Sequence, residues 1–205
     1  MGDMDIRKSP FPAIAGAILA GGVSSRFGSN KALALLDRKP VIRHVADILA
    51  PIFPTCLLST NTPEAYAFLG LPTVADIFPR SGPLGGIHAV LNAIVEPRAF
   101  IVGCDMPLLD PFLIRFLCTL AEQNDLDAVL PWPVSGPEPL CAVYSRSALP
   151  VIEKNLKKGN WKVGDNLEEL RVRRVGEKEL LAIVADLSSL HNINRPEDLA
   201  DIIGS

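Results

Sequence analysis

The chain has 205 residues, of which 48% are hydrophobic and 21% are charged, and its formal net charge at pH 7 is −3. A chain of this size can bury one continuous core, and its charge excludes the broad basic field typical of nucleic-acid-binding proteins. Four scattered cysteines and three distant histidines argue against a disulfide framework and against a zinc site. No signal-peptide core stands out, and the uncharged run over residues 9–25 is broken by prolines and glycines and is too short to span a membrane. We therefore expect a cytoplasmic protein with no membrane or nucleic-acid partner.

The first predicted element is a buried strand over residues 13–19, which opens into a glycine loop. This loop contains Gly21 and Gly22 and ends with the cations Arg26 and Lys31. Glycines let backbone N–H groups approach phosphate oxygens closely, and the two cations supply charge for a polyphosphate. The alternative is an ordinary strand-to-helix turn with two solvated cations. Residues 1–12 are expected to form a flexible N-terminal segment, and residues 13–205 a single domain.

The rest of the chain alternates between strand and helix patterns. Strands are predicted over residues 55–59, 73–75, 99–102, 128–130, 140–144 and 172–175, with a short extended segment at 190–193. Helices are predicted over residues 41–50, 63–69, 111–122, 148–157 and 161–170, with a last helix beginning at 195. One more helix is expected from Gly85 or Gly86 to residue 94, after a loop over 78–86. This alternation predicts an α/β fold, a Rossmann-like three-layer sandwich with a mainly parallel sheet.

Polar residues follow several of the predicted strands. The glycine loop, Asn61, Asp76 and Asp105 each come directly after one. Because ligands of open α/β sheets bind beyond the carboxyl ends of the strands, we expect these residues to converge at one edge. The sequence matches neither the P-loop, G-x-x-x-x-G-K-[ST], nor the dinucleotide fingerprint, G-x-G-x-x-G. A different kind of phosphate site is therefore indicated.

The pattern L-A-G-G-x-S-x-R-x-G-x-x-K-A-L, from Leu19 to Leu33, resembles the signature of sugar- and cofactor-nucleotidyltransferases. Within that group the chain is most similar to the molybdenum cofactor guanylyltransferases. Four later segments follow that family's order: S-G-P-L-G-G-I at 81–87, G-C-D-M-P at 103–107, E-P-L-C-A-V-Y at 138–144 and N-I-N-R-P-E-D-L at 192–199. The chain departs from the family at Phe27, usually Met, at Asn30, usually Asp, and at Arg195, usually Thr.

The resemblance implies a fold of the nucleotide-diphospho-sugar transferase type and a magnesium-dependent reaction. In that reaction GMP passes from GTP to molybdenum–molybdopterin, forming the guanine dinucleotide cofactor and pyrophosphate. Asp105 would hold Mg²⁺, since magnesium prefers one or two carboxylates together with phosphates. Arg26 and Lys31 would hold the β- and γ-phosphates. Another reading of Asp105 is a cap for the helix that begins near Pro111.

The remaining candidate residues fall into three groups. Leu19, Ala20, Gly21 and Gly22 would line the nucleotide, while Asn61 (or Ser59) and Asp76 would contact the base or ribose. Gly82, Pro83 and Leu84 would close over the nucleotide or the acceptor, and Glu138, Asn192 and Asn194 would meet the acceptor. Turn capping or ordinary loop hydrogen bonds are the alternatives for the polar members. Trp132 and Trp161 could stack on a pterin or belong to the core.

Two other functions remain open at this point. One is a related transferase that uses CTP, or that acts on a sugar phosphate or lactate phosphate. The cytidylyltransferase relatives usually read L-A-A-G, so Gly22 favours GTP. The other is a catalytically silent nucleotide-binding protein that assists cofactor assembly, against which the presence of Arg26, Lys31 and Asp105 argues. Transient contacts with other cofactor-assembly proteins are also expected.

Overall fold

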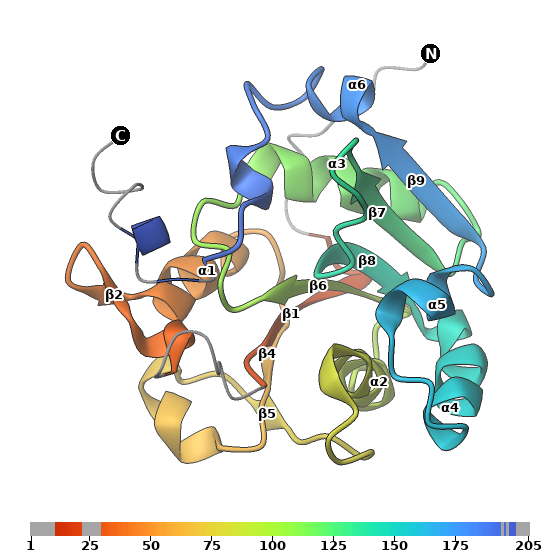
Figure 1. Cartoon of the computed structure of the whole chain (residues 1–205), viewed down its shortest axis with the longest axis horizontal. Coiled ribbons are helices and arrows are strands. Elements are labelled where there is room, and N and C mark those ends of the chain that lie inside the picture. The colour runs from red at the N-terminus through yellow and green to blue at the C-terminus, as the bar shows by residue number, and fades with distance from the viewer. Residues whose placement is uncertain (1–10, 22–29, 194, 196, 200–205) are drawn as a thin grey trace.

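The computed structural model describes residues 11–21, 30–193, 195 and 197–199. Its centre is a seven-stranded sheet in the order β5-β4-β1-β6-β8-β7-β9 (Figure 1). The strands are β1 (Ile14–Leu19), β4 (Cys56–Ser59), β5 (Thr73–Val74), β6 (Arg98–Gly103), β7 (Ala128–Trp132), β8 (Cys141–Ser145) and β9 (Val172–Gly176). Strand β8 is antiparallel to its neighbours β6 and β7, and the other pairs are parallel. The predicted mainly parallel sheet is confirmed.

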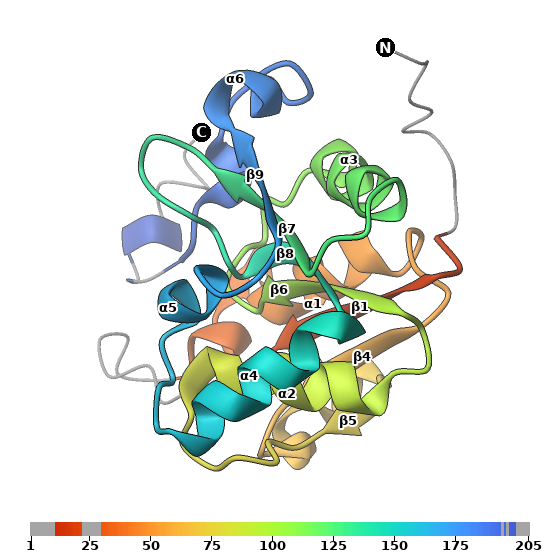
Figure 2. The same ribbon diagram turned by 90° about the vertical axis from the view of Figure 1, so that its right-hand side faces the viewer.

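Helices cover both faces of this sheet (Figures 1 and 2). The α-helices are α1 (Val41–Leu49), α2 (Gly82–Ala93), α3 (Pro111–Glu122), α4 (Leu149–Lys157), α5 (Val163–Leu167) and α6 (Glu177–Leu180). Helices α1 and α3 pack on one face, and α2 and α4 pack on the other. Short 3₁₀ segments occur at Lys31–Leu33, Pro63–Leu69, Arg146–Ala148 and Ser188–Leu190, and a small hairpin joins β2 (Leu35–Leu36) to β3 (Lys39–Pro40). The predicted three-layer sandwich is therefore confirmed.

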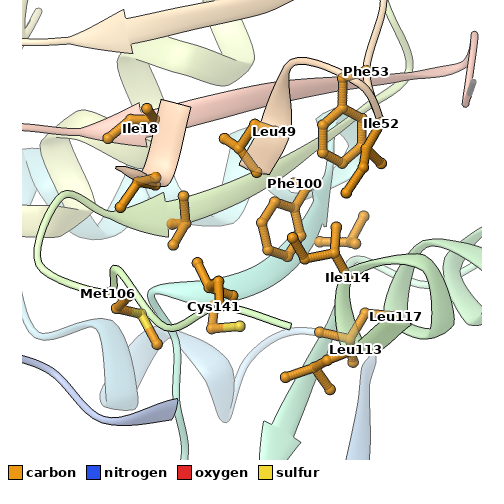
Figure 3. Packing of buried hydrophobic residues seen from close by; sticks show 14 of the residues in the cluster. Ile18, Leu49, Ile52, Phe53, Phe100, Met106, Leu113, Ile114, Leu117 and Cys141 are labelled. Carbon is orange, nitrogen blue, oxygen red and sulfur yellow. The ribbon is translucent and has the colours of Figure 1, made fainter. Parts of the chain in front are cut away.

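The alternation of side chains along the central strands creates a core on each face. In β1, Ile14 and Ile18 point into the core shared with α1 and α3, while Ala15, Ala17 and Leu19 point toward α2 and α4. All six residues of the strand are buried, as expected for a central parallel strand covered on both sides. Figure 3 shows the first of these cores around Phe100, whose ring stacks on that of Phe53 at a centroid distance of 5.7 Å.

The strand order reverses between β1 and β6. From β1 the chain moves outward to β4 and β5, then returns to place β6 on the opposite side of β1. Leu19 at the end of β1 pairs with Gly103 at the end of β6, and the Cys104 N–H donates to the Leu19 carbonyl over 3.1 Å. In open α/β sheets such a reversal leaves a crevice outside the strand ends, where ligands bind. The fold thus delivers the residues after β1 and β6 to one place.

Several element boundaries differ from the predictions. Helix α2 begins at Gly82, so the expected loop over 78–86 was wrong in its last five residues, because Pro83 fits the first turn of a helix. The 63–69 helix is a 3₁₀ helix, and the expected helix over 161–170 contracts to α5. Strand β7 extends through Pro131, whose carbonyl accepts from the Glu138 N–H. The N and the carbonyl of a strand residue point to the same side, so the N–H that proline lacks would point to the side where β8 no longer pairs with β7.

A buried carboxylate, that of Asp127, links the residues that directly precede β7 and β9. Asp127 accepts hydrogen bonds from the Arg171 backbone N–H (3.0 Å), from its Nε (3.0 Å) and Nη2 (2.9 Å), and from the Ser147 hydroxyl (2.6 Å). The Arg171 guanidinium is the main reason that the pKa of Asp127 falls to about 2. A carboxyl whose pKa is lower in the folded state stabilises the fold above its unfolded pKa of about 4 and loses that contribution as the pH falls.

We therefore expect the Asp127→Asn variant to be less stable than the parent chain at pH 7, because it loses the charge that pairs with Arg171. The expected loss is only about 1–2 kcal/mol, since Arg171 is half exposed and solvent weakens the pair. That difference should shrink as the pH falls from about 4 to about 2. Urea unfolding at pH values between 7 and 2 measures it. Asp125→Asn is the matched control, since Asp125 is 92% exposed and also pairs with Arg171. A difference that does not change with pH would contradict this role.

Candidate active site

An ion pair between Lys31 and Asp105 stands at the point where the strand order reverses. Asp105 follows β6, and Lys31 is the first residue of the 3₁₀ segment that comes after the glycine loop. The Lys31 Nζ contacts Asp105 Oδ2, and the two side chains are only 22% and 13% exposed. The structure thus brings together two of the three predicted catalytic residues, although 74 positions separate them.

The backbone around Asp105 fixes its carboxylate. A Cβ atom on Gly103 would lie 2.5 Å from Asp105 Oδ1, so only glycine leaves room for the carboxylate to fold back over the strand end. The Asp105 carbonyl accepts from the Ile193 N–H over 2.9 Å, which anchors the C-terminal segment at the same place. The cap of α3 is Asp110, which accepts from the Phe112 N–H over 2.7 Å. Asp105 is therefore not that cap.

Asn30, one of the departures from the family pattern, positions the backbone of Lys31. Its Oδ1 accepts from the Ala32 N–H over 3.2 Å, which caps the 3₁₀ segment, and its Nδ2 donates to the Tyr66 hydroxyl over 2.8 Å. Tyr66 is 5% exposed, and burial raises the pKa of its phenol. Tyr66 did not stand out in the sequence because an aromatic residue in an apolar segment is indistinguishable from core. Asn30 thus links the segment that begins at Lys31 to a buried side chain.

Asn61 and Asp76 form a reciprocal pair beyond β4 and β5. The Asn61 Nδ2 donates to Asp76 Oδ2 over 2.8 Å, and the Asp76 backbone N–H donates to Asn61 Oδ1 over 3.0 Å. Asn61 is exposed and Asp76 is half-buried at the strand ends, whereas Ser59 is 3% exposed and lies beneath α2 beside Gly86. Of the two alternatives for a nucleotide contact, the geometry favours Asn61.

The end of β1 and the start of α2 lie against each other. Leu19 and Ala20 are buried, Gly21 is exposed, and the Ala20 N–H donates to the Ser59 carbonyl over 2.9 Å. A Cβ on Gly86 would lie 3.2 Å from both Leu19 Cδ2 and Ser59 Oγ, so this glycine lets α2 approach the strand ends. The first turn of α2 contains the predicted residues Gly82, Pro83 and Leu84, of which Leu84 is buried and the other two are exposed.

Glu138 and Asn192 lie beside Asp105 on the other side of the site. The Glu138 carboxylate is half-buried and hydrogen-bonded with the Asn192 amide. Desolvation by burial raises the pKa of Glu138, and the Asp105 carboxylate raises it further. Two carboxylates and one amide from three separate segments therefore share this corner. Such a corner attracts cations, and the Lys31 ammonium already contacts Asp105 there.

Three predicted site residues, Gly22, Arg26 and Asn194, lie outside the described residues. The two tryptophans have different environments. The Arg174 guanidinium covers Trp132 at 4.2 Å from the ring centroid, whereas Trp161 is 49% exposed. Within the described ranges, no three His, Cys, Asp or Glu side chains gather as a metal site, and no helix is long and apolar enough to cross a membrane.

Comparisons with known proteins give this arrangement a family. The model of the MobA-like NTP transferase domain matches residues 16–172. A molybdenum cofactor guanylyltransferase of Desulfosudis oleivorans is 40% identical over 188 residues, which cover 91% of this chain and 93% of that protein.

Solved structures agree with that match. The structure of molybdopterin-guanine dinucleotide biosynthesis protein A from Archaeoglobus fulgidus superposes with a TM-score of 0.83 at 28% identity, covering 93% of this chain and 97% of that one. A nucleotidyl transferase from Methanothermobacter, at 17% identity and a TM-score of 0.67, shares the fold. The chain therefore belongs to the family of MobA-like NTP transferase domains.

Proposed function

We propose that this chain is a guanylyltransferase that moves GMP from GTP to the phosphate of molybdenum–molybdopterin and releases pyrophosphate, with residues 13–205 acting as one domain. The observation that carries the proposal is the Lys31–Asp105 pair at the β1/β6 strand ends, in a chain 40% identical to a protein named for this activity. Attack of one phosphate on another brings two anions together. The protein must therefore hold both and neutralise the charge that develops on the leaving group.

Lys31 would hold the β- and γ-phosphates, together with Arg26. Its ammonium already lies at the strand ends, on a backbone that Asn30 and Tyr66 hold in place. The backbone of Leu19 to Gly22 would line the nucleotide. A cation whose backbone is held beside the strand ends needs only a short movement of its side chain to stabilise departing pyrophosphate, which is an advantage of an enzyme site over water.

The Asn61–Asp76 pair would recognise the guanine base or its ribose. A carboxylate can accept two hydrogen bonds from the N1–H and 2-amino groups of guanine, and CTP offers no such pair of donors. The reciprocal hydrogen bonds with Asn61 fix the orientation of the Asp76 carboxylate. This orientation supports a preference for GTP.

The donor set at Asp105 fits a divalent ion of the magnesium type. Magnesium takes one or two carboxylates and completes its shell with phosphates and waters, and Asp105 with Glu138 nearby offers this kind of surrounding. When bound there, Mg²⁺ would neutralise phosphate oxygens and polarise the phosphorus that is attacked. Glu138 and Asn192, with Asn194, would meet the acceptor, and Gly82 to Leu84 would border both substrates.

Calorimetric titration of the chain with each of the four nucleoside triphosphates in the presence of Mg²⁺ tests this function. We expect binding of GTP at least tenfold tighter than that of CTP. Release of pyrophosphate from GTP should then depend on added molybdenum–molybdopterin. Tighter binding of CTP would overturn the guanylyl assignment, and tight GTP binding without turnover would indicate a silent nucleotide-binding protein.

A prediction follows for Asn30. In the Asn30→Ala variant we expect kcat to fall about 5- to 20-fold, with a smaller rise in the KM for GTP, because Lys31 remains but its backbone loses the cap and the Tyr66 contact. Asn30→Asp should restore most of the rate, since a carboxylate can also accept from the Ala32 N–H. Steady-state pyrophosphate release measures both variants. If Asn30→Asp is as impaired as Asn30→Ala, the cap does not position Lys31.

A further inference from the structure

A small apolar cluster is separate from the two cores that lie on the faces of the sheet. It consists of Leu36, Val41 and Ile193, which are 4%, 0% and 1% exposed, with Ala34 and Leu199 packed against them. Leu36 and Val41 come from the β2–β3 hairpin and the start of α1, whereas Ile193 belongs to the C-terminal segment, which Figure 1 shows beside them. Early and late parts of the sequence therefore meet in this cluster.

The hairpin side of the cluster is joined to Lys31. The Ala34 N–H donates to the Lys31 carbonyl over 3.2 Å, and the Ala34 carbonyl accepts from the Val41 N–H over 2.9 Å. Ala34 therefore connects the backbone of the lysine to the cluster that it packs against. Because apolar side chains gain free energy when they leave water, the contact between Leu36 and Ile193 holds the hairpin against the C-terminal segment.

The main chain at Ile193 is joined to the other half of the site. Its N–H donates to the Asp105 carbonyl over 2.9 Å. The residue before it, Asn192, is hydrogen-bonded with the Glu138 carboxylate. A β-branched side chain has a restricted χ1 angle, so burial of the Ile193 side chain also fixes the main chain that makes these contacts. Ile193 thus lies between the segment of Lys31 and the two carboxylates.

We propose that Ile193 is a positioning residue for nucleotidyl transfer, which holds the Asp105 main chain in a fixed place relative to the segment that carries Lys31. Through Asn192 it also fixes the Glu138 carboxylate on the acceptor side. The inference rests on the proposed function, in which Asp105 holds the metal and Asn192 meets the acceptor. The Ile193 side chain is 1% exposed, so it acts through these residues and not on a substrate. A misplacement of about 1 Å at a reacting group can lower a rate about 10²-fold.

The kinetic test compares Ile193→Ala with Ile193→Val. In Ile193→Ala we expect kcat to fall about tenfold and the KM for molybdenum–molybdopterin to rise about fivefold or more, because the segment that contacts Asp105 and Glu138 loses its anchor. The KM for GTP should stay within about twofold of the parent value, since the hydrogen bonds of Asn30 still hold the Lys31 backbone. Ile193→Val keeps the branched end of the side chain, and it should restore most of kcat and of the KM for the acceptor.

A substitution on the opposite wall of the cluster tests whether Ile193 acts by packing. Leu36→Ala should lower kcat by a similar factor, and the double variant with Ile193→Ala should be no more than about twofold slower than the slower single variant. Ile114→Ala is the matched control. Ile114 is 0% exposed in the core beside α3, so its loss destabilises the chain as a buried isoleucine does and leaves this cluster intact. Its kcat and KM values should therefore remain those of the parent chain.

Hydrogen exchange followed by NMR measures the placement of Ile193 without turnover. In Leu36→Ala we expect the amide of Ile193 to exchange about tenfold faster or more relative to that of Gly103, which is hydrogen-bonded at the end of β6. In Ile114→Ala this ratio should not change, because a loss of global stability alone affects both amides.

An unchanged exchange ratio in Leu36→Ala would overturn the inference. So would parent-like kinetic constants in Ile193→Ala, an equal rise in both KM values, or the same kinetic losses in Ile114→Ala. A changed exchange ratio in a chain without guanylyl transfer would instead retain Ile193 as the residue that places the Asp105 main chain, and would remove the proposed function.

Discussion

Asp105→Asn is expected to lower the kcat of guanylyl transfer about 10³-fold or more while the chain stays folded. The substitution keeps the size of the side chain, so the space above Gly103 remains filled. It removes the negative charge that pairs with Lys31 and would hold a divalent ion, and an amide is a much weaker ligand for magnesium. Removing one electrostatic element of a preorganised site typically costs 10²–10³ in kcat, and Asp105 would contribute two such elements.

The measurement is pyrophosphate release at saturating GTP and acceptor, with urea unfolding to confirm the fold. Asp110→Asn is the matched control. Asp110 lies five residues away and caps α3, and asparagine can accept the same hydrogen bond, so this variant is expected to change stability little and the rate no more than twofold. A kcat of Asp105→Asn within tenfold of the parent value would remove Asp105 from the chemistry. Gly103→Ala should impair turnover as well, because the new Cβ displaces the Asp105 carboxylate.

The sequence was most informative about the carboxyl ends of the parallel strands. Because such ends share one edge, placing Lys31 and Asp105 after their strands was enough to predict that they meet. What it could not predict were contacts that depend on strand order. The pairing of Asn61 with Asp76 requires β4 and β5 to be neighbours, and no local pattern encodes that adjacency.

The predicted boundaries of helices and loops were wrong where one residue type favours two different structures. Proline and glycine after residue 80 indicate a loop, but the same residues fit the first turn of a helix, and α2 starts there. The two tryptophans were equivalent candidates in the sequence, and only tertiary packing distinguishes them, since Arg174 arrives at Trp132 from a different strand. The sequence did not indicate a role for Tyr66 at the site for a related reason: its hydroxyl accepts a hydrogen bond from Asn30, which lies 36 positions away in the chain.

The Lys31–Asp105 pair leads to a second prediction, in which two effects have opposite signs. In the absence of nucleotide the ammonium of Lys31 contacts the carboxylate that would bind the metal, so the two cations compete for Asp105. In Lys31→Met we therefore expect metal binding without nucleotide to be stronger, on the order of 3- to 10-fold, the range for removing a partly solvated like charge. Turnover should nevertheless fall about 10²-fold or more, because the phosphates lose their cation.

Mn²⁺ binding followed by electron paramagnetic resonance, together with pyrophosphate release, distinguishes this role from a merely structural one. Lys39→Met is the matched control, since Lys39 pairs with Asp47 on an exposed surface and should change neither quantity. Weaker Mn²⁺ binding by Lys31→Met would mean that Lys31 helps to shape the metal site rather than competing for it. Stronger binding with lost turnover would show that the same lysine keeps Asp105 occupied until phosphates draw its ammonium away. In that case metal and nucleotide bind cooperatively, because the phosphates that take up Lys31 also release the carboxylate.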